Sequence, residues 1–136
     1  MLRALGCPAV STWKTADNWL IEVADVATVR RLTPDFARLG TLVEHGVIVT
    51  ARGEEEGIDF VSRFFAPAYG VAEDPVTGSA HCSLVSFWAG KLKKTEFVAR
   101  QLSARGGLLR LRLAGERVAI AGQAVTVVRG KLELPD

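Results

Sequence analysis

Apolar and polar residues alternate in several short stretches of this chain, whereas one longer stretch is apolar on nearly every side. Alternating or β-branched stretches predict strands over residues 18–23, 46–50, 58–65, 97–104, 108–114, 118–121 and 124–134. Asp25 is placed to cap a short helix over 26–32, and Pro34 suits the first position of a second short helix. Residues 66–78 are rich in proline and glycine and predict a loop.

The longer apolar stretch predicts one helix over residues 79–93. At ~100° per residue its apolar side chains cover most of the circumference, so the helix needs partners on all sides. We therefore expect an α+β fold, in which a mixed, strongly curved β-sheet or barrel wraps around this one central helix. Cys82 lies on the helix and is expected to be a small core residue.

The length of 136 residues suggests a single domain over residues 1–136. No apolar run reaches the ~18 residues of a membrane span, and the first residues do not have the pattern of a secretory signal peptide. The two cysteines, Cys7 and Cys82, match neither a metal-binding spacing nor a disulfide framework. We therefore expect a cytoplasmic protein with no membrane association and no metal site.

The charge is distributed unevenly along the chain. Residues 1–90 hold seven basic and eleven acidic residues, a net charge of −4, whereas residues 91–136 hold ten and four, a net charge of +6. The basic residues mostly alternate with apolar ones, as Arg110 and Arg112 do, which is typical of the solvated face of a strand. No aromatic residues are interleaved for base stacking, so nucleic acid is not an expected partner, whereas an anionic small molecule stays open.

The start of the predicted helix carries the candidate chemistry. The first N–H groups of a helix have no acceptor within it, and such starts bind carboxylate or phosphate oxygens. Thr77 can cap one N–H with its hydroxyl, while Gly78 and Ser79 leave the approach open. A capped helix without a ligand is the alternative. The rigid acidic sequence Glu73-Asp74-Pro75 favours a binding site, because a cap alone does not need two acids.

Three stretches together resemble a known family. They are Arg63-Phe64-Phe65-Ala66-Pro67 followed by Glu73-Asp74-Pro75-Val76-Thr77-Gly78-Ser79-Ala80-His81-Cys82, then Gln101-Leu102-Ser103-Ala104-Arg105-Gly106-Gly107, then Gly122-Gln123-Ala124-Val125-Thr126-Val127. The likeness is to the PhzF-like proteins, named for an isomerase of phenazine biosynthesis, which share a fold with diaminopimelate epimerase and proline racemase. It covers most of the chain and points to the C-terminal half of the family.

The resemblance implies a fold of two similar halves, each a sheet curled around a central helix, with the active site in the cleft between them. Both helix starts would hold the acidic group of the substrate. A glutamate of the N-terminal half moves a proton in the isomerisation, and the positions here that match the facing aspartate and serine are Asp74 and Ser79. Neither a metal nor an organic cofactor is implied. We therefore expect catalytic roles for Asp74 and Ser79, and substrate binding by Thr77, Gly78, Ser79, Ala80 and His81.

Two departures from the family pattern matter. The N-terminal half with its proton-moving glutamate has no counterpart in residues 1–50, so a chain without it would be inactive or incomplete alone. In the racemase and epimerase relatives a cysteine precedes the glycine-rich helix start, and Val76 stands about there. Racemisation by two cysteines is therefore not supported.

Several residues keep two interpretations. Asp74 could hold a substrate amine or assist proton transfer, or accept backbone N–H bonds in the loop. Ser79 could bind a ligand or be only a small residue of the first turn. His81 could relay a proton or pack against a backbone group. Arg63 could reach the cleft or the solvent.

The sequence thus predicts an isomerase-family domain that binds a small carboxylate-bearing metabolite and lacks half of its active site. The alternative is a non-catalytic binding module of the same fold. In either case we expect a homodimer, in which each copy covers the surface that a sister half would cover.

Overall fold

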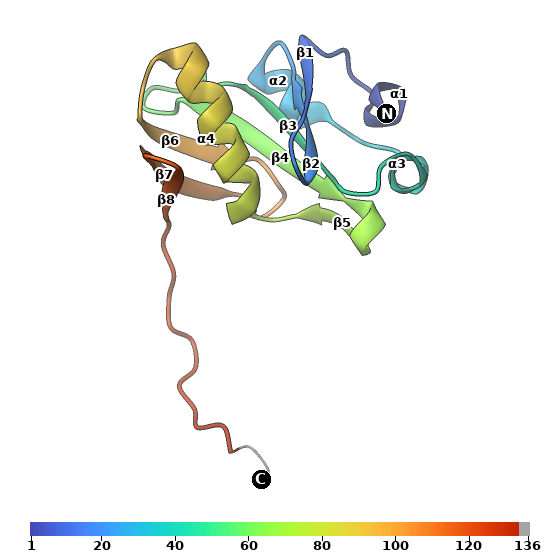
Figure 1. The fold of residues 1–136 in the computed structure, drawn as a ribbon. Helices are drawn as coiled ribbons and strands as arrows, with labels where there is room; N and C mark the ends of the chain where they lie inside the picture. The colour runs from blue at the N-terminus through green and yellow to red at the C-terminus, as the bar shows by residue number, and fades with distance from the viewer. Residues whose placement is uncertain (134–136) are drawn as a thin grey trace.

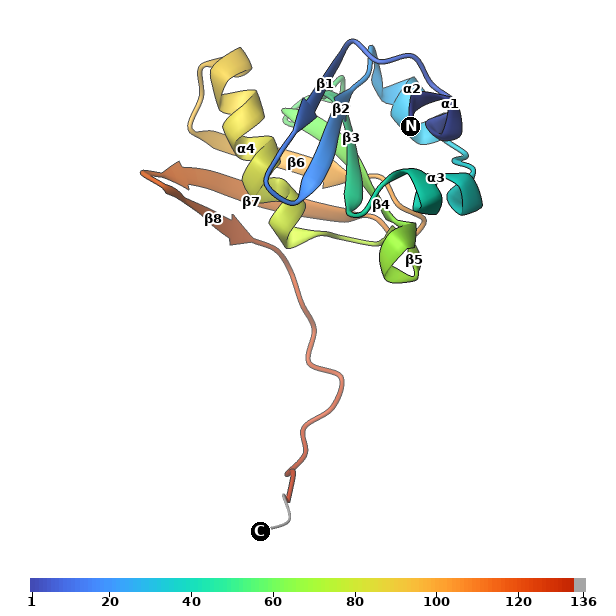
Figure 2. The same cartoon turned by 45° about the vertical axis from the view of Figure 1, so that its right-hand side comes forward.

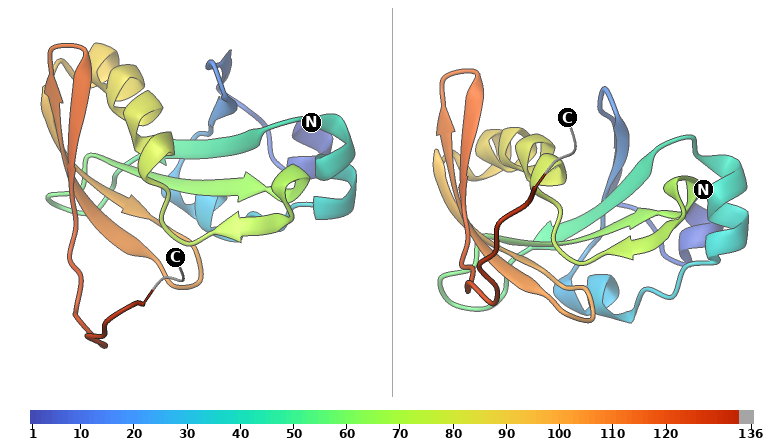
Figure 3. Two further views of the ribbon diagram at one scale, coloured as in Figure 1. Left: turned by 60° about the horizontal axis from the view of Figure 1, so that its bottom comes forward. Right: turned by 90° about the horizontal axis from the view of Figure 1, so that it is seen from below.

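The structure is a computed structural model that describes residues 1–133. They form one mixed sheet of eight strands with a long helix in its concave side and short helices on its other face (Figures 1 and 3). The strands are β1 Ser11–Lys14, β2 Asn18–Glu22, β3 Gly46–Arg52, β4 Phe60–Ala66, β5 Val71–Asp74, β6 Glu96–Gln101, β7 Gly107–Ala114 and β8 Arg117–Ala121. The helices are α1 Leu2–Leu5, α2 Val26–Arg31, α3 Phe36–Leu42, α4 Gly78–Leu92 and the 3₁₀ turn η1 Pro67–Tyr69.

The strand order is β1-β2-β3-β4-β6-β7-β8, and β5 pairs with the end of β4. Two pairs are parallel: β2 with β3, joined by α2 and α3, and β4 with β6, joined by a connection that contains α4. The remaining pairs are antiparallel. Strand β4 therefore lies in the middle of the sheet, and its register brings β5 and β6 beside the two ends of one strand.

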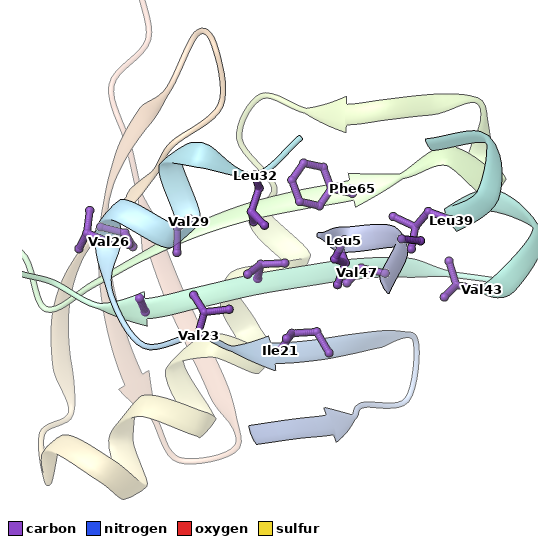
Figure 4. Packing of buried hydrophobic residues seen from close by; sticks show 14 residues of the cluster. Leu5, Ile21, Val23, Val26, Val29, Leu32, Leu39, Val43, Val47 and Phe65 are labelled. Carbon is purple, nitrogen blue, oxygen red and sulfur yellow. The ribbon is translucent and has the colours of Figure 1, made fainter. Parts of the chain in front are cut away.

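Side chains from the two faces of the sheet build two cores. The first lies under α1, α2 and α3 and includes Leu5, Val29, Leu39, Val47 and Phe65 (Figure 4). The second lies between the sheet and α4 and includes Phe60, Phe64, Leu84, Trp88 and Leu111. Because successive residues of a strand point to opposite faces, β4 sends Phe60 and Phe64 to α4 and Phe65 to the other core.

The predicted elements are mostly confirmed. The structure has the predicted strands at β2, β3, β4, β6, β7 and β8, and the long helix is α4. Asp25 caps α2 by accepting a hydrogen bond of 2.6 Å from the N–H of Thr28. The second short helix begins two residues later than predicted, at Phe36, because Asp35 provides its cap.

The predicted enclosure of the helix is wrong in part. The sheet curves beneath α4 but does not close into a barrel, because it ends at β1 on one side and at β8 on the other (Figure 3). One stripe of α4 is therefore exposed, and it consists of the small residues Ser79, Cys82, Ser86 and Gly90. Cys82, which we expected in the core, lies in this stripe.

The predicted strand over residues 124–134 is not formed. Residues 122–133 are exposed and have no strand partner, and they leave the body of the protein after β8 (Figures 1 and 2). Residue 134, the last of the predicted strand, lies outside the described residues.

Candidate functional site

The candidate site lies where the chain passes from β5 into α4. Strand β5 ends at Asp74, which stands opposite Phe64 of β4, and α4 begins four residues later at Gly78. The short turn through Pro75 holds the Asp74 side chain close to the first turn of the helix. The predicted neighbourhood of this acid and the helix start is therefore confirmed.

Gln101 ties this turn to the end of β6. Its side-chain carbonyl accepts a hydrogen bond of 2.8 Å from the N–H of Thr77, and its Nε2 donates one of 2.7 Å to the carbonyl of Asp74. Nε2 also lies 3.2 Å from Oγ1 of Thr77. Gln101 is fully buried, so these bonds are formed away from water. The side chain fixes both ends of the turn at once.

Thr77 occupies the cap position of α4, but its hydroxyl does not cap the helix as we predicted. The hydroxyl donates instead to the carboxylate of Asp74. No side chain of the described residues accepts a hydrogen bond from the N–H groups of the first turn. The consequence is a held carboxylate beside helix N–H groups that keep their binding capacity.

The family-like stretch from Gln101 to Gly107 also packs against the turn before α4. The hydroxyl of Ser103 donates a hydrogen bond of 2.7 Å to the carbonyl of Pro75 and accepts one of 2.9 Å from the N–H of Gly106. A Cβ atom on Gly107 would lie 2.4 Å from a methyl of Val76, so only glycine allows this close approach. The stretch from Gln101 to Gly107 thus acts as the support of the turn before α4.

His81 faces the core one turn into α4. Its ring is fully buried, stacks on Phe60 at a centroid distance of 6.1 Å, and has Nδ1 2.7 Å from the carbonyl of Thr77. Because a carbonyl oxygen only accepts, Nδ1 carries the proton there. Burial lowers the pKa of His81, against a smaller opposing effect of the bond to Thr77. The packed interpretation of this histidine is confirmed, and its side chain holds the helix start rather than reaching the surface.

Glu73, the acid next to Asp74, points to the face of the sheet opposite to α4. Glu73 forms a two-bond ion pair with Arg63, whose Nε and Nη2 lie 2.6 and 2.9 Å from the carboxylate oxygens. Nη1 of Arg63 also donates to the carbonyls of Leu32 and Val29 at the end of α2, at 2.8 and 3.2 Å. Arg63 therefore joins β4, β5 and α2, which settles its open assignment in favour of a structural role.

The remaining predicted site residues differ in exposure. Gly78 and Ser79 are exposed, Asp74 is half-buried, and Ala80 lies in the core. Two grooves of about 830 and 400 Å³ are present. One lies between the turn before β4 and strands β6 to β8, and the other lies beside the β6–β7 turn, where Gln101, Ser103 and Gly107 line it. The exposed residues Gly78 and Ser79 line neither of these two grooves. Residues 1–133 contain no group of three potential metal ligands, and none of their helices is long and apolar enough to cross a bilayer.

Comparisons with known proteins agree with this geometry. The family model described as "Phenazine biosynthesis-like protein" matches residues 4–130. The chain belongs to the PhzF-like family. Within it, the chain is 55% identical to a protein of Pseudomonas aeruginosa named as an uncharacterized isomerase, and 43% identical to one of Halalkalibacterium halodurans with the same description. These matches cover 97% and 98% of this chain, but 50% and 51% of the relatives.

A solved structure shows the same fold. A PhzF-family protein of Enterococcus faecalis superposes with a TM-score of 0.88 at 40% identity, over 98% of this chain and 50% of that protein. The chain therefore spans about half the length of the relatives it matches.

No role for Gln101 was predicted from the sequence, although a signal was present. In β6, Phe97, Ala99 and Gln101 occupy the alternate buried positions, so a polar amide falls where an apolar residue is expected. A buried amide needs hydrogen-bond partners. Its partners here are the main chain of the motif that carries the candidate chemistry.

Proposed function

We propose that this chain is the C-terminal half of a PhzF-like isomerase active site, which binds a small carboxylate at the start of α4. The observation that supports this most is the open first turn of α4, where no side chain of residues 1–133 caps the N–H groups beside the carboxylate of Asp74. The N–H groups of Gly78 and Ser79 would hold the substrate carboxylate, and the Ser79 hydroxyl would add a further donor.

The binding region would be supported from the protein interior by three buried residues, Thr77, Ala80 and His81. Thr77 and His81 are buried and joined by a hydrogen bond of 2.7 Å, and Ala80 packs in the core. Their part is to keep the first turn in place, because their side chains do not reach the exposed surface. We assign ligand contact to the exposed backbone and to Ser79.

Asp74 would act on the part of the ligand next to the carboxylate. An acid so close to a bound anion repels it unless the ligand also carries an ammonium or a transferable proton. A ligand with both groups, such as an amino acid, satisfies the helix start and Asp74 together. Asp74→Asn should therefore weaken binding of an amino acid but not binding of the matching acid without the amine, which the carboxylate repels, and equal weakening would contradict this role.

The chain alone would be incomplete as a catalyst. Proton transfer at a carbon needs an acid and a base on opposite sides, and Asp74 and Ser79 stand on one side. The resemblance implies that the other group is a glutamate of an N-terminal half, for which we find no counterpart in residues 1–50. We expect a full-length relative to promote exchange of a carbon-bound proton in heavy water, detected by proton NMR, and this chain to show none. Exchange by this chain that Asp74→Asn abolishes would refute the incompleteness.

A second candidate is a non-catalytic homodimeric module of the same fold. The exposed stripe of α4 favours it, because a helix in the concave side of a sheet normally has this face covered. We propose no cofactor, nucleic acid or membrane partner for either candidate, and we place the protein in the cytoplasm. Turnover by the chain would exclude the second candidate.

A further inference from the structure

The open side of α4 is bordered by two strands that have free edges. Strand β1 pairs only with β2, and β8 pairs only with β7, within the described residues. The ribbon of α4 runs between them (Figure 3), and its small residues Cys82, Ser86 and Gly90 are exposed. Small residues on a helix allow another backbone to approach it closely. We call this surface, from β1 across these three residues to β8, the α4 opening.

Each side of the α4 opening carries an exposed large apolar side chain. Trp13 of β1 is 56% exposed and packs edge-on against Phe87 of α4, with ring centroids 6.3 Å apart. On the other side, Ile120 of β8 is 40% exposed. Free strand edges next to exposed large apolar side chains are typical of a surface that takes up another strand.

The segment with matching chemistry is the tail of the same chain, by which we mean residues 122–133. Val125, Val127 and Val128 are 86%, 87% and 80% exposed, whereas Val10, the most exposed valine of the body, is 63% exposed. Residues 124–128 are β-branched at four of five positions, and Val125 and Val127 alternate with Thr126, as in a strand with one apolar face. The tail has the composition of a strand and lacks only a partner.

The sheet topology gives the two free edges the same direction. The pairs from β1 to β8 comprise four antiparallel and two parallel steps, so β1 and β8 run in the same direction. A strand that is antiparallel to one of them is therefore antiparallel to the other. An inserted strand would face α4 with every second side chain, as the alternation of the tail requires.

We propose that residues 124–128 of a second copy of this chain insert into the α4 opening, with Val125 and Val127 facing the helix. The tail extends away from its own body and covers none of its own α4 (Figures 1 and 2). Reciprocal exchange of two tails about a two-fold axis would cover both openings in a closed dimer. The covered residues begin at Cys82, one turn after Ser79, so the start of α4 stays free. The proposal is independent of carboxylate binding.

Cysteine cross-linking tests this arrangement directly, because Cys82 lies in the opening. In the full chain with Cys7→Ser, Val127→Cys is treated with a short bismaleimide and analysed by denaturing gel electrophoresis. We expect a covalent dimer that disappears when Cys82→Ser is added. The matched control is Thr126→Cys, whose side chain would point away from the helix and should give no Cys82-dependent dimer. A product linked within a single chain, or equal yields from positions 126 and 127, would overturn the proposal.

A second measurement determines the oligomeric state of the protein without cross-linking. Light scattering should give the mass of a dimer for the full chain and of a folded monomer for Val125→Asp with Val127→Asp, while Thr126→Asp stays dimeric. Circular dichroism checks that each variant is folded. A monomeric full chain, or a dimer that the double variant leaves intact, would show that the tail does not form the interface.

Discussion

Replacing Gln101 with leucine should separate the turn before α4 from the end of β6. Leucine keeps much of the side-chain volume but removes the three hydrogen bonds to Thr77 and Asp74. The buried N–H of Thr77 loses its acceptor, which costs about 1–3 kcal/mol, and the half-buried carbonyl of Asp74 loses a bond worth about 1 kcal/mol. We therefore expect the free energy of unfolding to fall by about 2–4 kcal/mol.

Urea unfolding followed by circular dichroism measures this loss, and hydrogen exchange of the Thr77 amide locates it. The matched control is Arg100→Leu on the neighbouring residue, whose partner Glu55 is exposed, with a nitrogen–oxygen distance of 3.2 Å. That change should alter stability by less than about 1 kcal/mol. A Gln101→Leu variant as stable as this control, with unchanged protection of Thr77, would refute the supporting role of Gln101.

Three further variants test other parts of the account. Arg63→Met leaves the mostly buried carboxylate of Glu73 without its partner and should cost about 2–3 kcal/mol in urea unfolding, whereas a loss under about 0.5 kcal/mol would argue against the structural role. Gly107→Ala should cost about 1–3 kcal/mol, because its methyl would lie 2.4 Å from a methyl of Val76; Val76→Ala should restore part of this loss, and simple additivity would count against the contact. The pKa of His81 is lowered in the folded state, so the unfolded chain binds more protons as the pH falls below the ordinary value of 6.5. The contribution of His81 to the free energy of unfolding is therefore complete above 6.5 and is lost as the pH falls from there toward the folded pKa. His81→Leu should therefore flatten the decline of stability below that pH, and an unchanged profile would show that another group causes it.

Much of the fold could be predicted because local pattern and final environment agree. Strands β3 and β4 are apolar on both faces because helices cover both, and α4 is apolar on most sides because the sheet curves beneath it. Strand β5 was missed, since the predicted loop over 66–78 gains its strand only by pairing with β4. The predicted strand over 124–134 is absent for the opposite reason. Its valines favour a strand, but no strand of residues 1–133 pairs with them.

The start of α4, where the candidate site lies, could be predicted, but the hydrogen bonds around it could not. The motif around Asp74 and Ser79 marked the start of α4 correctly, because proline, glycine and small polar residues are rarely placed at a buried helix by packing alone. The direction of the Thr77 hydroxyl could not be predicted, because it depends on Asp74 and on Gln101, 24 residues away. Likewise, nothing local indicated that Glu73 would pair with Arg63 on the opposite face of the sheet.

The most direct test of the account is whether the first turn of α4 binds an oxyanion. The amide signals of Gly78 and Ser79 can be followed by nitrogen-15 NMR while benzoate is added, with uncharged benzamide as the matched ligand. The account predicts saturable shifts of these two amides with benzoate and none with benzamide. Equal shifts with both ligands, or benzoate shifts confined to other residues, would contradict it.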